Sequence, residues 1–206
     1  MTDFMQLVNE RRSANNFYEN ITITKEELNE IFDIVKLAPS AFNLQHTKYL
    51  VVIDPVMKEK MRKAANGQYK VKSASAVILV LGDRNAFYNA TEIYEGLNML
   101  GIVSKQEYDH LVSDTISFYE SRGSEFHKED AIRNASLSSM LFMLAAKEKG
   151  WDTCPMIGFD PEAVKELLNI DDQTEVVMMI TIGKEKVESR KPRGYRKPVS
   201  EFVSYI

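Results

Sequence analysis

Hydrophobic residues recur at helical spacing in several stretches of the chain. Between residues 28 and 35 they lie three or four positions apart, directly after Thr24 and Glu27, which have the spacing of a capping box. A helix is therefore expected there, and Pro39 would stop it. Further helices are predicted over residues 4–12, 56–65 and 128–149, and Gly150 is well placed to end the last of these. Another helix is expected to start at Asp160-Pro161.

Other stretches have the composition of strands. Tyr49–Ile53 is rich in β-branched residues and is closed by Asp54-Pro55. Ala76–Leu81 is apolar without interruption, which is typical of a strand buried on both faces. Val176–Ile182 predicts a last strand. Because helices separate these strands and outnumber them, the order is typical of an α/β or α+β protein with one sheet between helical layers.

The region from about residue 84 to residue 127 differs from the rest, because it is rich in aromatic residues and has a weaker core periodicity. Ser104 and Glu107 form a second capping box, and one apolar face follows over residues 108–119. We interpret this region as a helical excursion packed against the main body. No repeat, low-complexity tract or linker divides the chain, so a single domain over residues 1–206 is expected.

The composition limits the possible classes of protein. The chain is 44% hydrophobic and 27% charged, as ordinary globular proteins are. Its single cysteine, Cys154, excludes an intrachain disulfide and fits a cytoplasmic location. The first residues contain no apolar signal segment, and Ala76–Leu81 is too short to cross a membrane. We therefore predict a cytoplasmic protein without a membrane partner.

The charge is unevenly distributed. The formal net charge is −4, yet residues 184–197 contain seven Lys or Arg and two Glu, so this segment carries +5 and the rest −9. An acidic body argues against a nucleic-acid partner, which needs a basic face. The basic segment suits a site for a small anion, with a solvated tail as the alternative.

Several common catalytic motifs are missing. No two glycines form G-x-G, and there is no P-loop or G-x-S-x-G elbow. His46, His110 and His127 form no ligand pair, so no metal site is predicted. Cys154 lies among apolar residues and is expected to be a buried structural thiol. An enzyme with this sequence would need a cofactor to carry the reaction.

Five short polar segments remain as candidates for cofactor contacts, although turn, helix-end and solvent explanations exist for each one alone. They are 11–15, 38–46, 66–70, 153–159 (interpreted as an uncharged turn) and 190–198. Guanidinium groups in the first and last segments match a phosphate, because they donate two parallel hydrogen bonds. Ser, Asn and Gln in the second segment suit the polar edge of a heteroaromatic ring.

In this order the segments resemble the nitroreductase family of FMN flavoproteins, over almost the whole chain. The matching residues are Arg11, Arg12 and Ser13 for R-R-S; Ala38, Pro39, Ser40, Asn43 and Gln45 for A-P-S-x-x-N-x-Q; Cys154 through Val164 for C-P-M-x-G-F and D-P-E-x-V; and Arg193, Arg196 and Pro198 for R-x-x-R-x-P. The resemblance implies an α+β three-layer sandwich with a central mixed sheet, in which a C-terminal extension wraps the partner subunit of a homodimer.

The resemblance also implies which residues contact FMN. Arg11, Ser13, Arg193 and Arg196 would hold the phosphate, while Ser40 and Asn43 would reach the flavin of the other subunit. Gln68 and Lys70 would face its pyrimidine edge, and the 155–158 turn would line the opposite side. The full implied set is Arg11, Arg12, Ser13, Asn15, Pro39, Ser40, Asn43, Gln68, Lys70, Pro155, Met156, Ile157, Gly158, Arg193 and Arg196.

The implied activity is hydride transfer from NADH or NADPH through FMN to nitroaromatic or quinone acceptors, by a ping-pong mechanism and without a catalytic side chain. The alternatives are another flavin-dependent reductase or dehydrogenase on the same fold, and a flavin-binding redox sensor with little turnover. Phe118, Tyr119 and Phe126 would either roof the acceptor pocket or only pack the excursion. Three residues depart from the family pattern. Asn15 stands where many members have Lys or Arg, His46 stands where Pro is common, and Ile157 stands where some members have Glu.

Overall fold

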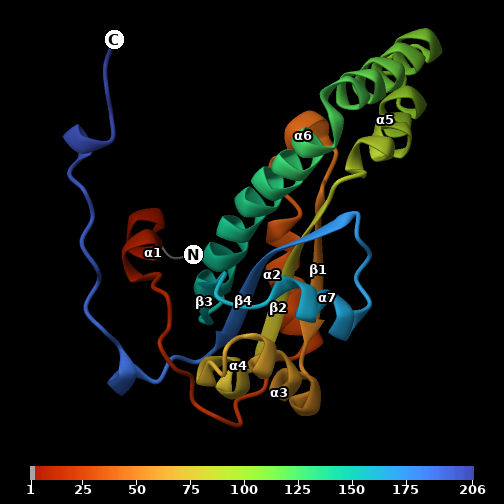
Figure 1. Ribbon diagram of the computed structural model, residues 1–206. Helices are drawn as coiled ribbons and strands as arrows, with labels where there is room; N and C mark the ends of the chain where they lie inside the picture. The colour runs from red at the N-terminus through yellow and green to blue at the C-terminus, as the bar shows by residue number, and fades with distance from the viewer. Residues whose placement is uncertain (1–2) are drawn as a thin grey trace.

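The computed structural model describes residues 3–206 and confirms an α+β architecture (Figure 1). Its α-helices are α1 (Phe4–Glu10), α2 (Lys25–Val35), α3 (Pro55–Ala64), α4 (Tyr69–Ser73), α5 (Ala90–Met99), α6 (Lys105–Glu148) and α7 (Pro161–Leu168). Its strands are β1 (Thr47–Val52), β2 (Ala76–Asp83), β3 (Asp152–Met156) and β4 (Thr174–Gly183). None of the helices within residues 3–206 is long and apolar enough to cross a membrane.

The four strands form one sheet in the order β1-β2-β4-β3. Each neighbouring pair is antiparallel, so the expectation of a mixed sheet is wrong for these strands. A parallel contact does occur as an isolated bridge between Ser13 and Thr153, outside the named strands. The direct connections from β1 to β2 and from β3 to β4 reverse the chain direction. The pair β2 and β4 is antiparallel because β3, which precedes β4, runs the same way as β2.

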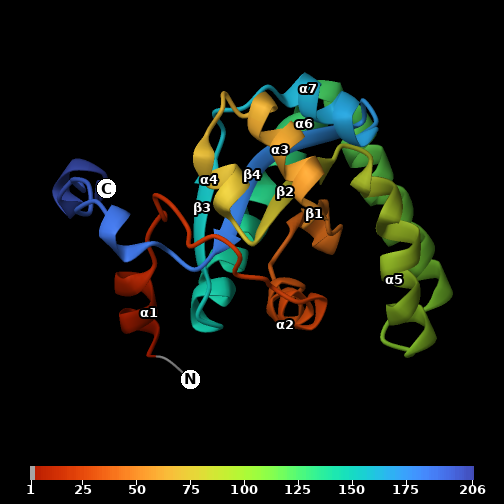
Figure 2. The same cartoon turned by 90° about the horizontal axis from the view of Figure 1, so that it is seen from below.

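Helices cover both faces of the sheet, which makes three layers (Figure 2). The alternation of side chains along β2 assigns the layers: Ala76, Ile78 and Val80 share a core cluster with residues of α2 and α6. Val77 and Leu79 belong to a second cluster, with residues of α3, α4 and α7. The uninterrupted apolar run of β2 therefore reflects burial on both faces, as predicted.

The predicted helical excursion forms an arm that extends beyond the sheet (Figure 1). It consists of α5 and the first half of α6, and its own small core contains Phe87 and the fully buried Tyr119. The long helix predicted over 128–149 is the second half of α6. Gly123, with φ of +76°, interrupts the helical geometry between the two halves, a conformation that glycine adopts without steric cost.

Local signals predicted the helix starts well but missed two elements. Thr24 and Ser104 form the expected capping boxes, and Asp160 caps α7. The segment expected to be a turn at 153–159 instead begins as the edge strand β3, where Pro155 is tolerated because an edge strand leaves some N–H groups unpaired. The 66–70 segment, for which a solvated loop was the alternative, instead contains the start of the short helix α4 at Tyr69.

A glycine in β2 allows the sheet to approach α6 closely. A Cβ atom added at Gly82 would lie 2.9 Å from the backbone oxygen of Ala131. We expect Gly82→Ala to lower the free energy of unfolding by about 1–3 kcal/mol, because the backbone of α6 must move to relieve the clash. Gly96→Ala is the control, since a Cβ atom there meets nothing within 4 Å. Urea unfolding should show Gly96→Ala to be neutral or stabilising, and equal effects of the two changes would contradict the packing argument.

Candidate cofactor-binding site

The N-terminal segment and the basic C-terminal segment meet in one hollow of the surface. This basic hollow is lined by Arg11, Arg12, Ser13, Asn15, Arg190, Lys191, Pro192, Arg193, Gly194 and Arg196. None of the described residues that line it is Asp or Glu. All six residues that the sequence assigned to these two segments as FMN contacts therefore lie together.

Hydrogen bonds to the main chain hold the basic hollow in shape. The chain leaves α1 at Arg11, and the Ala14 N–H donates to the Thr153 carbonyl at 2.9 Å, which fixes the segment against β3. Arg193 Nη2 donates to the carbonyl oxygens of Asn9 and Arg11, at 2.6 and 3.1 Å. Asn15 Nδ2 donates to the Ser189 carbonyl at 3.0 Å, so Asn15 links the two segments.

The electrostatics of the basic hollow favour an anion. Burial, followed by the charges of Arg193 and Arg196, lowers the pKa of Arg11 from its ordinary value. A guanidinium stays protonated in spite of such a shift, so the three cations repel one another and an anion among them would relieve that repulsion. A phosphate fits this donor set because it accepts several charge-assisted hydrogen bonds at once.

A second group of expected contacts lies between α4 and β3. Gln68 Nε2 donates to the Gly158 carbonyl at 2.9 Å, and Asn66 Nδ2 donates to the same oxygen at 3.2 Å. Lys70 Nζ lies 3.4 Å from the sulfur of Cys154, which is buried as expected. This group thus brings Gln68 and Lys70 to the 155–158 segment.

Within that segment, two adjacent residues differ in exposure. Met156 is buried as the last residue of β3, whereas the Ile157 side chain is 78% exposed. Because the bridge between Ser13 and Thr153 joins β3 to the N-terminal segment, this second group adjoins the basic hollow. The two groups form the part of the candidate site that a single chain assembles.

The 38–46 segment lies elsewhere in the same chain. Pro39 and Ser40 line a different hollow, together with residues of α2 and β1. Asn43 is exposed, in a short 3-10 turn over Ala41–Asn43. One chain therefore does not bring Pro39, Ser40 and Asn43 to the basic hollow.

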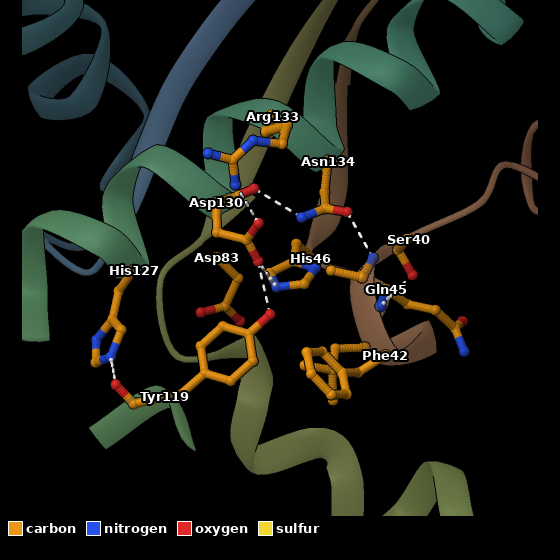
Figure 3. A network of polar contacts seen from close by, with 12 residues as sticks. Ser40, Phe42, Gln45, His46, Asp83, Tyr119, His127, Asp130, Arg133 and Asn134 are labelled. Carbon is orange, nitrogen blue, oxygen red and sulfur yellow. Dashed lines mark hydrogen bonds and ion pairs between the residues drawn. The ribbon is translucent and has the colours of Figure 1, made fainter. Parts of the chain in front are cut away.

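Buried polar residues under the 38–46 segment form a network that the sequence analysis missed (Figure 3). Asp130 Oδ2 accepts a hydrogen bond from Tyr119 Oη at 2.6 Å and lies 3.2 Å from His46 Nε2. Asp130 Oδ1 pairs with Arg133 at 2.6 Å. Asn134, one turn further along α6, accepts from the Ala41 N–H at 2.8 Å. The spacing of Asp130 and Asn134 on one helix face was the available signal.

The charge of Asp130 is stabilised by its neighbours. Burial would raise the pKa of this carboxyl group, but His46, Tyr119 and Arg133 outweigh that effect and lower it to about 2. Burial and the hydrogen bond to Asp130 raise the pKa of the Tyr119 hydroxyl. Asp130 is therefore an acceptor at neutral pH, and Tyr119 is its donor.

This depressed pKa predicts an acid-dependent contribution to stability. A carboxyl group whose pKa is lower in the folded state stabilises above its ordinary value of 3.8, and this stabilisation is lost as the pH falls toward 2. We expect the difference in free energy of unfolding between wild type and Asp130→Asn to shrink by roughly 2 kcal/mol between pH 6 and pH 2. Asp109→Asn, in an exposed pair with Lys105, is the control. A constant difference for Asp130→Asn in denaturant titrations would contradict the assignment.

Known proteins resemble this chain over most of its length. The model of the nitroreductase family matches residues 8–184. The Bacillus subtilis (strain 168) protein MhqN, which is named as an NAD(P)H nitroreductase, is 71% identical over 206 residues, covering 100% of both chains. The crystal structure of the Bacillus subtilis nitroreductase ydfN has a TM-score of 0.97 at 70% identity and covers 98% of each chain.

A solved structure at lower identity contains a ligand. It is a nitroreductase from Exiguobacterium sibiricum 255-15 in complex with FMN, with a TM-score of 0.92 at 31% identity, covering 100% of this chain and 98% of that one. The family model and the relative at 71% identity establish the class of protein: this chain belongs to the nitroreductase family. The fold expected from the resemblance is thereby confirmed, apart from the antiparallel sheet.

Proposed function

We propose that this chain is an FMN-dependent oxidoreductase that passes a hydride from NADH or NADPH to a nitroaromatic or quinone acceptor. The observation that carries the proposal is the basic hollow, where Arg11, Arg193 and Arg196 lie close enough to repel one another and no described lining residue is Asp or Glu. Membership of the nitroreductase family and the FMN complex of a relative at 31% identity support the same cofactor. A cytoplasmic location would supply the NADH or NADPH that this activity needs.

The chain's own residues bind and orient the cofactor. Arg11, Ser13 and the Arg193–Arg196 segment would hold the phosphate, with Arg12 and Asn15 completing that end of the site. Lys70 would place a positive charge near the ring, and Gln68 would donate to its polar edge. The residues Pro155, Met156, Ile157 and Gly158 would line the other side. When bound, FMN supplies a ring atom that accepts and donates a hydride, so no side chain needs to do so.

The arrangement of the site supports a homodimer. Pro39, Ser40 and Asn43 lie away from the basic hollow of their own chain, so they would contact the FMN held by a partner. The C-terminal segment runs along the outside of the molecule beside α1 and ends away from the sheet (Figure 1). A partner subunit would cover its exposed apolar side chains.

The exposed site between the subunits would accept the nucleotide and the acceptor in turn, which is a ping-pong reaction. Nitroaromatics and quinones are flat and electron-poor, so they can stack where the nicotinamide has left, without a protein acid at the contact point. The exposed Ile157 side chain would form an apolar surface at the mouth of this site.

The test is the visible absorption spectrum of the purified protein under anaerobic conditions. We expect an oxidised-flavin band that bleaches on addition of NADPH or NADH and recovers on addition of a quinone or nitroaromatic. A colourless protein that takes up no added FMN would overturn the proposal. Bleaching without recovery by any acceptor would favour a redox sensor instead.

A further inference from the structure

The loop between α2 and β1 has an unfavourable backbone conformation at three residues. Phe42, Asn43 and Gln45 have φ angles of +51°, +57° and +54°, in the left-handed region that L-residues rarely adopt. A bulky residue such as Phe42 is unusual there. Strained residues of this kind persist only where surrounding contacts hold them, and they concentrate at ligand-binding segments.

The loop itself supplies little of that support. Residues 38–46 contain no glycine. The Gln45 N–H donates to Ser40 Oγ at 3.0 Å, and the Asn43 and Leu44 N–H groups donate to the carbonyls of Ser40 and Ala41. These contacts close a turn but do not connect it to the rest of the molecule. A connection between a helix and a strand could adopt a relaxed turn without any such strain.

Two buried residues of α6 hold the two ends of the loop (Figure 3). Asn134 Oδ1 accepts from the Ala41 N–H at 2.8 Å, and Asp130 Oδ2 lies 3.2 Å from His46 Nε2. Asn134 Nδ2 also donates to the Asp130 carbonyl at 2.7 Å, which ties the two residues together. Asp130 and Asn134 are each 3% exposed. Burying such groups is costly unless their partners are well placed.

The helical arm adds contacts to the middle of the loop. Tyr94 Oη donates to the Phe42 carbonyl at 3.0 Å, and the Phe42 ring packs against Phe118, with ring centroids 5.5 Å apart. Tyr119 contacts both the loop, through the Phe42 ring, and Asp130, through its hydroxyl group. The loop is therefore fixed from α6 and from the arm at once.

We propose that Asp130 and Asn134 are positioning residues, which hold the strained 41–46 loop in the shape that presents Ser40 and Asn43 to FMN. The inference rests on the proposed function, because it needs FMN as the ligand of that loop. It also gives a role to His46, which departs from the family pattern: its side chain is 1% exposed and anchors the end of the loop to Asp130.

The test compares flavin affinity and loop exchange in matched variants. Asn134→Leu removes the acceptor for Ala41, whereas Ser136→Ala on the same helix removes only the hydroxyl bonded to the exposed Ile132 carbonyl. We expect Asn134→Leu to weaken FMN binding at least 10-fold and to speed amide exchange in residues 40–46, with β2 unchanged. Riboflavin binding should weaken by the same factor as FMN binding, because the loop faces the ring and not the phosphate. Ser136→Ala should match wild type.

The other end of the loop provides an independent pair of variants. His46→Leu should weaken binding of both flavins, while His46→Gln, which keeps a donor for Asp130, should stay within about threefold of wild type. This pair decides the question if Asn134→Leu does not fold. Unchanged flavin affinity in the Leu variants that fold would overturn the inference, even with a lower melting temperature. Failure of the wild type to bind any flavin would instead overturn the proposed function.

Discussion

Replacement of Arg11 by alanine is expected to weaken FMN binding by about 10- to 100-fold. Arg11 is half-buried in the basic hollow, and its backbone carbonyl accepts from Arg193, so its position is fixed before any ligand binds. Loss of one charge-assisted contact of this kind costs roughly 1.5–3 kcal/mol, which corresponds to the stated change in affinity. The measurement is FMN fluorescence titration of the apoprotein.

Two controls make the Arg11 result specific. Lys60→Ala removes an exposed cation of α3 outside the basic hollow, so a general effect of charge would appear there too. Riboflavin lacks the phosphate, so its affinity should be the same in wild type and Arg11→Ala. Equal losses for FMN and riboflavin would place Arg11 away from the phosphate. Unchanged flavin content after extensive dialysis of the variant would contradict the assignment altogether.

Removal of residues 199–206 is expected to destabilise the proposed dimer strongly. Three apolar side chains of this tail are exposed: Val199 (60%), Phe202 (66%) and Tyr205 (91%). Burying a side chain of this size against a partner would contribute roughly 1.5–3 kcal/mol. If a partner covers half of this surface, each tail contributes roughly 2–4 kcal/mol. A dimer of truncated chains lacks both tails, so its Kd should rise by about 1,000-fold or more. The truncated chain retains Arg193 and Arg196, so the basic hollow itself remains.

Sedimentation equilibrium with and without FMN measures this effect. Val56→Ser is the matched control, since Val56 is 66% exposed on α3, on the body of the molecule rather than on the tail. We expect the truncated protein to shift toward monomer and to lose FMN at the same time, because Ser40 and Asn43 would no longer reach it. A full-length monomer with tightly bound FMN would contradict the shared site.

The local signals in the sequence predicted most of the elements because those signals act within a few residues. The capping boxes at Thr24 and Ser104 and the cap at Asp160 form as expected. The strand β3 was missed because Cys154-Pro155 has turn-forming composition, and only its place at the edge of the sheet makes the proline acceptable. The direction of the strands was also out of reach, because it depends on how distant elements connect.

The candidate site was predictable as a set of segments only through their resemblance to a family. No local pattern indicates that Arg193 donates to the carbonyl of Arg11, 182 residues earlier, or that Gln68 contacts Gly158. The left-handed residues of the 41–46 loop gave no signal either, because none of them is a glycine.

The sequence by itself determined where helices begin, which strand is buried on both faces, and that the chain has one basic segment while the rest of it is acidic. These properties depend on side-chain chemistry and spacing along the chain. The tertiary structure decided that the two arginine segments share one hollow, that Asp130 and Asn134 contact the ends of the 41–46 loop, and that Ser40 and Asn43 lie apart from the basic hollow. The physical reason is that contacts between elements follow from sheet order and core packing, which act over the whole chain at once.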